Sequence, residues 1–181
     1  NSETYGGAIN CNNSDLEIRG GNVYNNSSYA GGAIFVDSLS TCSVDDVYFN
    51  NNGANRGGAI ATFRGGRLAV HGSDFYQNSA NGFEENVDPN FPTYAGGGAI
   101  YQEFADTLEI SNTNFSNNSA TAGPGGAMAL YHGTEVLLDS IVIRNNSSTG
   151  GGGGLCLLRP ENVIFNHGVI MDNRSDWNSG G

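Results

Sequence analysis

The chain has 181 residues, of which 38% are hydrophobic and 28 are glycine, and its formal net charge at pH 7 is −11. This length suits one domain, but so few apolar residues exclude a thick globular core. The seven basic residues are all arginine, and this acidic balance argues against nucleic acid and anionic membrane surfaces as partners.

The apolar runs, the first residues and the cysteines exclude further classes. Apolar runs are only a few residues long, whereas a membrane helix needs about 20, so we expect no direct membrane insertion. The opening NSETYGG lacks the regions of a signal peptide, so either a leader has been removed or the chain is an internal piece. Three cysteines without CxxC spacing give no zinc signature, and we predict no cofactor.

Two short motifs alternate along the chain. The first is a glycine doublet followed by two mostly apolar residues, and it starts at Gly6, Gly31, Gly57, Gly97, Gly125 and Gly153. The second is an apolar residue followed three positions later by asparagine, and it ends at Asn26, Asn52, Asn78, Asn118, Asn146 and Asn173. Successive starts of the first motif lie 25, 26, 40, 28 and 28 residues apart. This self-similarity predicts six units of one repeat.

Each unit contains three short apolar stretches of alternating character, which is typical of strands. In chain order, the residues expected to face inward are Ile9, Leu16, Ile18 and Val23; Ile34, Cys42, Val44 and Phe49; Ile60, Leu68, Val70 and Phe75; Ile100, Leu108, Ile110 and Phe115; Met128, Val136, Leu138 and Ile143; and Cys156, Val163, Phe165 and Ile170. Its place in the first column makes Cys156 a buried, inert thiol.

Three strands per unit predict an all-β fold, a parallel β-helix (β-solenoid) of about six coils. Backbone hydrogen bonds would join coils about 4.8 Å apart, and no coil could bury its inner face alone. A leucine-rich repeat has a similar period, but its Leu-x-x-Leu-x-Leu pattern is absent. We therefore assign residues 1–181 to a single β-helix segment, which is either a fragment of a longer array or a stacking unit.

The asparagine that ends each second motif is interpreted as structural. Equivalent asparagines would stack at a tight corner and bond one another in a ladder, as amides do in cross-β assemblies. The glycine doublet would give the backbone the freedom to leave that corner. Cys11 and Cys42 fall in adjacent coils and form a candidate disulfide.

Residues 79–96 form an 18-residue insertion that we interpret as an inserted loop. Long loops on a rigid scaffold often carry recognition. The candidate recognition residues are Phe83, Glu84, Glu85, Phe91 and Tyr94. The alternative is a loop that folds back and covers the side of the helix. A calcium site from Glu84, Glu85, Asp88 and Asn90 is a weaker alternative, because EF-hand spacing is absent.

Two sets of outward positions carry residue types that could support catalysis or modification. Asp45, His71, Ser111 and Asp139 occupy one position in four consecutive coils and superficially resemble a hydrolase triad. That position follows an inward residue, so we expect it to face solvent and assign no catalytic residue. Several N-x-S/T sequons occur, and Asn25, Asn117 and Asn145 are the candidate glycosylation sites because they precede a ladder residue and should face outward.

The doublet of GGAI and FxxN, as in GGAI from Gly57 and FYQN ending at Asn78, resembles the polymorphic outer membrane protein repeats of chlamydiae. The resemblance covers nearly the whole chain. It implies a right-handed β-helical passenger region displayed outside the cell, often adhesive and often an autotransporter.

We therefore predict a non-catalytic extracellular β-solenoid, secreted or at the cell surface, that acts as an adhesin or passenger-type display segment. Its expected partners are other copies or further coils of the same protein, and a host-cell or glycan ligand. Gly180 and Gly181 look like the start of a seventh coil, so the alternative is a structural subunit of a filament or hair assembled head to tail. A polysaccharide-acting β-helix enzyme is the third alternative.

Overall fold

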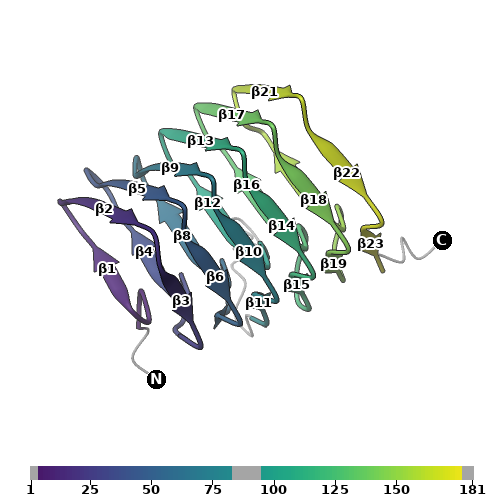
Figure 1. Cartoon of the computed structure of the whole chain (residues 1–181), viewed down its shortest axis with the longest axis horizontal. Helices are drawn as coiled ribbons and strands as arrows, with labels where there is room; N and C mark the ends of the chain where they lie inside the picture. The colour runs from purple at the N-terminus through teal and green to yellow at the C-terminus, as the bar shows by residue number, and fades with distance from the viewer. Residues whose placement is uncertain (1–3, 83–94, 177–181) are drawn as a thin grey trace, which may run out of the picture.

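The structure of the chain is a computed structural model that describes residues 4–82 and 95–176. Its strands form four parallel sheets wound into a β-solenoid, and three of these sheets have six strands, one from each coil. Figure 1 shows the coils side by side along the long axis, with the first coil in purple at one end and the last in yellow at the other. These residues contain no helix, and therefore none suited to crossing a membrane.

Every sheet is built from equivalent strands of successive coils. The first sheet contains β1 (Ile9–Cys11), β4 (Ile34–Val36), β8 (Ile60–Phe63), β12 (Ile100–Glu103), β16 (Met128–Tyr131) and β20 (Leu155–Leu158). The second contains β2 (Asp15–Arg19), β5 (Thr41–Asp45), β9 (Arg67–His71), β13 (Thr107–Ser111), β17 (Glu135–Asp139) and β21 (Asn162–Asn166). The third contains β3 (Asn22–Tyr24), β6 (Tyr48–Asn50), β10 (Asp74–Tyr76), β14 (Asn114–Ser116), β18 (Val142–Arg144) and β22 (Val169–Met171).

A fourth sheet was not predicted. It contains β7 (Gly53–Ala54), β11 (Ser79–Ala80), β15 (Ser119–Ala120), β19 (Ser147–Ser148) and β23 (Arg174–Ser175). Each of these strands has two residues and follows the corner asparagine directly. A pair of small residues gives no apolar alternation, so the pattern that indicated three strands per coil could not indicate this one.

The strand register confirms most of the predicted inward columns and corrects one residue. The column of the first sheet runs from Ile9 to Met128 and continues with Leu155, whereas Cys156 pairs with Ala129 one position later. The assignment of Cys156 to that column was therefore wrong. The cause is the run of five glycines before Leu155: the glycine with positive φ, equivalent to Gly125, is Gly152 and not Gly153.

The core is a narrow stack of these columns. Phe49, Phe75 and Phe115 are fully buried, and their rings stack with centroids 4.7 and 4.8 Å apart and interplanar angles of 6° and 11°. That separation matches the distance between neighbouring strands, so identical residues in successive coils pack face to face.

The corner asparagines form one continuous ladder. Oδ1 of Asn118 accepts the backbone N–H and the side-chain N–H of Asn78, at 2.9 and 3.0 Å. Nδ2 of Asn118 donates to Oδ1 of Asn146 and to the backbone oxygen of Phe75, both at 3.0 Å. The same bonds connect the other pairs from Asn26 to Asn173. Each inner amide therefore satisfies its donors and its acceptor inside the fold.

The first sheet is also covered on its outer face. Phe35, Tyr101 and Tyr131 point outward from their strands but are buried in a second apolar cluster. The Arg56 guanidinium lies 5.8 Å from the Tyr101 ring centroid and 3.6 Å from the Glu103 carboxylate. Burial is the main reason why the pKa of Tyr101 is raised well above its usual value.

The insertion is shorter than predicted at both ends. Ser79 and Ala80 belong to β11, and Gly96 forms a bridge with Arg56. The candidate recognition residues Phe83, Glu84, Glu85, Phe91 and Tyr94 lie outside the described residues. The alternative calcium ligands Asp88 and Asn90 do so as well.

Candidate functional site

A shallow groove of about 430 Å³ lies at the corner between the first and second sheets. It spans four coils, from Leu39 in the second to Thr134 in the fifth. Gly65 and Ala105 line its middle. An added Cβ at Gly65 would meet nothing within 4 Å, so the groove is open above this residue. Its backbone is held in the coil-to-coil ladder, since the Gly65 N–H donates to the Phe104 oxygen at 2.7 Å.

The corner gives Phe104 its unusual position. Arg64, Phe104 and His132 each follow directly after a strand of the first sheet, and their φ angles are 50°, 52° and 51°. A left-handed turn at this point redirects the chain into the second sheet. It also places the side chain on the outside, where the Phe104 ring stacks on the His132 imidazole with centroids 4.6 Å apart and an interplanar angle of 8°.

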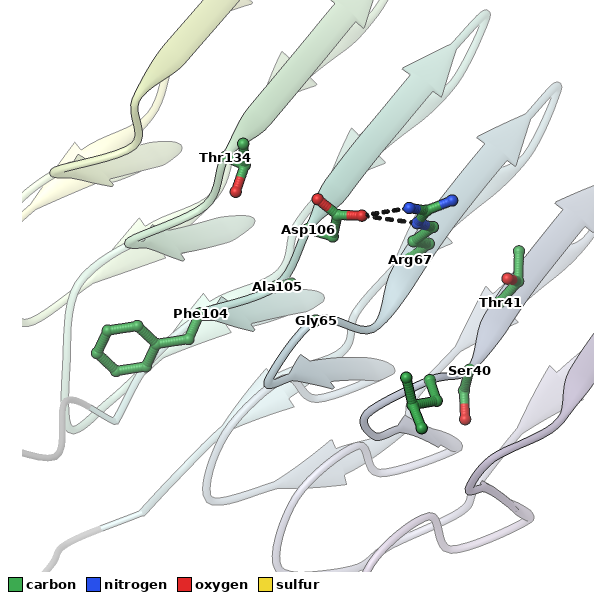
Figure 2. A pocket seen from close by; sticks show the side chains of 9 residues that line it. Ser40, Thr41, Gly65, Arg67, Phe104, Ala105, Asp106 and Thr134 are labelled. Carbon is green, nitrogen blue, oxygen red and sulfur yellow. Dashed lines mark hydrogen bonds and ion pairs between the residues drawn. The ribbon is translucent and has the colours of Figure 1, made fainter.

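An ion pair forms the polar wall of the groove. Nε and Nη2 of Arg67 lie 2.7 and 2.6 Å from Oδ2 of Asp106, and this pair bridges two neighbouring coils (Figure 2). Both contacts converge on one carboxylate oxygen. In the described part of the chain, Oδ1 of Asp106 and Nη1 of Arg67 take no part in this ion pair, and the two side chains are 37% and 60% exposed.

Sequence reasoning did not single out any residue of this groove. The signal was present in the repeat, because Phe104 follows its strand where other units carry Arg64 and His132, and Leu39 stands where they carry Gly65 and Ala105. The columns of inward residues define the repeat, whereas the corners between strands vary from coil to coil and carry no periodic pattern.

The column of Asp45, His71, Ser111 and Asp139 is aligned as predicted, on neighbouring strands of the second sheet. Nδ1 of His71 lies 2.9 Å from Oγ of Ser111. Among the described residues, Asp45 makes no hydrogen bond to His71. Asp139 instead contacts Nδ1 of His167 at 2.9 Å. On this surface, hydrogen bonds thus do not connect an acid to the imidazole that contacts the hydroxyl, as a triad requires.

The predicted glycosylation sites Asn25, Asn117 and Asn145 are all exposed, with φ angles of 58°, 56° and 53°. They project outward next to the ladder residues. Attachment of glycans at these three positions stays a prediction.

All three cysteines are free thiols in the structure, so the predicted bridge between Cys11 and Cys42 is not formed. Both residues are buried, and the Cys11 thiol lies 3.2 Å from the Ser14 oxygen. Burial, with a smaller contribution from Cys11, raises the pKa of the Cys42 thiol to about 12. Cys156 is only partly buried, which corrects the prediction of a buried thiol, although burial still raises its pKa. Within residues 4–82 and 95–176, no three Asp, Glu, His or Cys residues are grouped as metal ligands.

Comparison with known families finds one similarity. A family model described as the Chlamydia polymorphic membrane protein repeat matches residues 46–62 and 140–157. Each matched segment runs through the ladder corner, from before a strand of the third sheet into the following strand of the first. The resemblance drawn from the GGAI and FxxN motifs is thus confirmed at two places. No curated protein and no solved structure matches the chain.

Proposed function

We propose that this chain is a non-catalytic, extracellular display segment, similar in role to the surface passengers of polymorphic membrane proteins. The two repeat matches support this proposal, since the family name refers to membrane proteins of Chlamydia. The acidic charge of −11 also suits an exposed surface that stays soluble.

One observation carries the proposal: inward positions are uniform, while outward positions vary. In the second sheet, inward Leu68 and Leu108 occupy one apolar column. The outward row beside it changes chemistry at four of its five steps, through Glu17, Ser43, Ala69, Glu109, Leu137 and Ile164. A scaffold of this kind separates folding from recognition, because the backbone ladder and the core do not depend on the outer side chains.

The proposal is tested on intact cells that produce the full-length protein. We expect antibodies against residues 1–181 to label intact cells, and external protease to remove the labelled region. Beads coated with the purified chain should attach to host cells more than beads coated with albumin. Labelling only after permeabilisation, together with no bead attachment, would contradict the proposal.

The filament alternative concerns the apolar face of the last described coil. Phe165 and Ile170 in the last described coil are 38% and 52% exposed, whereas the equivalent Leu138 and Ile143 one coil earlier are fully buried. A further coil, from the same chain or from a second copy, would cover them. If the filament function holds, the purified chain forms fibres of uniform width in electron micrographs, and Ile170→Asp abolishes them. A monodisperse monomer at all concentrations would exclude it.

Lack of catalysis is tested at the aligned hydroxyl and imidazole. We expect the purified chain to cleave neither simple esters nor polysaccharides above background, and Ser111→Ala to leave that background unchanged. Turnover that disappears in Ser111→Ala would instead identify a hydrolase.

A further inference from the structure

We propose that the corner groove between Leu39 and Phe104 binds a short, uncharged oligosaccharide. This inference rests on the display function proposed above and gives it a ligand class and a site.

Two residues of the groove differ from the rest of the described surface in exposure. Leu39 is 81% exposed and Phe104 is 56% exposed. Every other large apolar residue with comparable exposure lies in the first or the last described coil, where the stack of coils ends. In the four inner coils of the described chain, the sequence thus leaves two large apolar side chains in solvent, and both line the same groove.

The backbone at these two residues is also unusual. Leu39 and Phe104 have φ angles of 59° and 52°. They are the only apolar residues among the non-glycine residues with positive φ in the described chain, and the others are polar. Bulky side chains disfavour this left-handed conformation, and such strain tends to occur at functional sites. Asparagine, which occupies six of the other positions with positive φ in the described chain, would be the residue selected for stability alone.

The groove offers the two kinds of contact that a sugar ring requires. A sugar has an apolar face of C–H groups and a polar edge of hydroxyls. The negative face of an aromatic ring such as Phe104 attracts polarised C–H groups. Oδ1 of Asp106 and Nη1 of Arg67 take no part in the ion pair and lie at its two opposite ends (Figure 2). They provide an acceptor and a donor for two separate hydroxyls. Thr134 adds a hydroxyl at the end of the groove.

Charge and rigidity determine which sugars fit. The Arg67 and Asp106 charges neutralise each other, with contacts as short as 2.6 Å, and the chain carries −11 overall. An anionic sugar would therefore meet general repulsion, whereas an uncharged one would not. The stack of Phe104 on His132 and the backbone ladder below hold the aromatic ring in place before a ligand arrives, which reduces the entropy lost on binding.

Binding is tested by calorimetry and saturation-transfer NMR with chitotetraose, maltotetraose and lacto-N-tetraose. We expect at least one of these probes to bind with a Kd below about 1 mM. Phe104→Asn should weaken that binding about tenfold without lowering the Tm, because asparagine tolerates the left-handed turn. The control Tyr24→Asn removes an aromatic side chain that is 60% exposed outside the groove and should leave the affinity unchanged.

The polar wall is tested in parallel. Asp106→Asn should weaken binding about tenfold, whereas Asp176→Asn, in a similar exposed ion pair with Arg174, should have no effect. The inference is wrong if none of the three probes binds below about 1 mM. It is also wrong if Phe104→Asn keeps full affinity, or if only a heparin tetrasaccharide or an extended peptide binds.

Failure of this inference can be separated from failure of the display function. Phe104→Asn protein should label on intact cells as strongly as the wild type. If it does and the wild type binds no neutral sugar, only the groove assignment is lost. If the wild type does not label, the display function is lost whatever the groove binds.

Discussion

Asn78 gives both its backbone N–H and its side-chain N–H to a single oxygen, Oδ1 of Asn118, in the next coil. This shared acceptor connects the backbone of one coil to a side chain of the next coil. It explains why the corner residue has to be an amide: a carboxylate could accept these bonds but could not donate onward to the following coil.

Removing one amide from the ladder should therefore lower the free energy of unfolding markedly. Asn118→Ala removes the acceptor of the backbone N–H and of one side-chain N–H of Asn78, and it removes the side-chain donor to the Phe75 oxygen, all in a buried corner. Oδ1 of Asn146 keeps only the backbone N–H of residue 118. Each buried unsatisfied group costs about 1–3 kcal/mol, so we expect a loss of at least about 3 kcal/mol in the free energy of unfolding. Urea denaturation measures it. Asn117→Gly, at the adjacent exposed residue with positive φ, should change stability little. Equal effects in the two variants would show that the ladder does not contribute.

The aromatic stack should be similarly sensitive. Phe75 packs between Phe49 and Phe115 and is fully buried. Phe75→Ala should lower the free energy of unfolding by about 3–5 kcal/mol, because the narrow solenoid cannot collapse around the cavity. Phe75→Leu should lower it by less than half of that. The comparison uses thermal and urea unfolding, and a Phe75→Ala loss below about 1 kcal/mol would contradict the packing described.

Gly126 should not tolerate any side chain. An added Cβ would lie 2.1 Å from the backbone oxygen of Gly153, in the next coil, and 2.5 Å from that of Ser147, at the end of its own coil. Backbone cannot move aside as a flexible side chain can, so Gly126→Ala should separate the fifth and sixth coils. We expect faster amide exchange after residue 146 and a lower Tm. Gly20→Asn is the control, because Gly20 has open space around it. Unchanged exchange in Gly126→Ala would be the contrary result.

Leu39→Asn should stabilise the chain. Leu39 is 81% exposed with φ 59°, so asparagine loses almost no packing and relieves an unfavourable conformation. The left-handed region costs an ordinary residue about 1–2 kcal/mol, and we expect roughly half of that to be regained. Thermal unfolding measures the gain. Leu39→Asp, which shares the local hydrogen bonding but adds negative charge, should gain less. A fall in Tm for Leu39→Asn would mean that Leu39 packs against an unseen neighbour.

Alkaline pH should destabilise the chain partly through Cys42. Its thiol has a folded pKa of about 12 against an ordinary value of 9.0. The unfolded thiol ionises first, so the contribution of the neutral thiol is complete below pH 9 and is lost as pH rises toward 12. As pH rises through this window, the free energy of unfolding of Cys42→Val should therefore fall less than that of the wild type, by up to about 1.4 kcal/mol per pH unit. The measurement compares urea midpoints at pH 7 and about pH 10. Identical pH slopes for both proteins would refute this assignment.

The sequence predicted the parts of the fold that repeat. The prediction was wrong where the repeat did not show at which residue a coil starts. The columns from Val23 to Ile170 and the ladder asparagines follow from a fixed spacing. Five consecutive glycines before Leu155 contain several doublets, and only the left-handed turn at Gly152 shows which one starts the coil. The two-residue strands were missed because Ser79 and Ala80 have no alternating pattern. The apolar character of Leu39 and Phe104 could be read from the repeat, but the groove could not, because these residues line one hollow only when the corners of different coils are stacked.

The ladder also constrains how such a molecule changes over evolutionary time. Each amide recognises only the amide directly above and the one directly below it, so a gene that gains or loses one complete turn by unequal crossing-over still encodes matching rungs. The protein can therefore lengthen by whole coils. Each added coil brings a new outer surface on which selection can act.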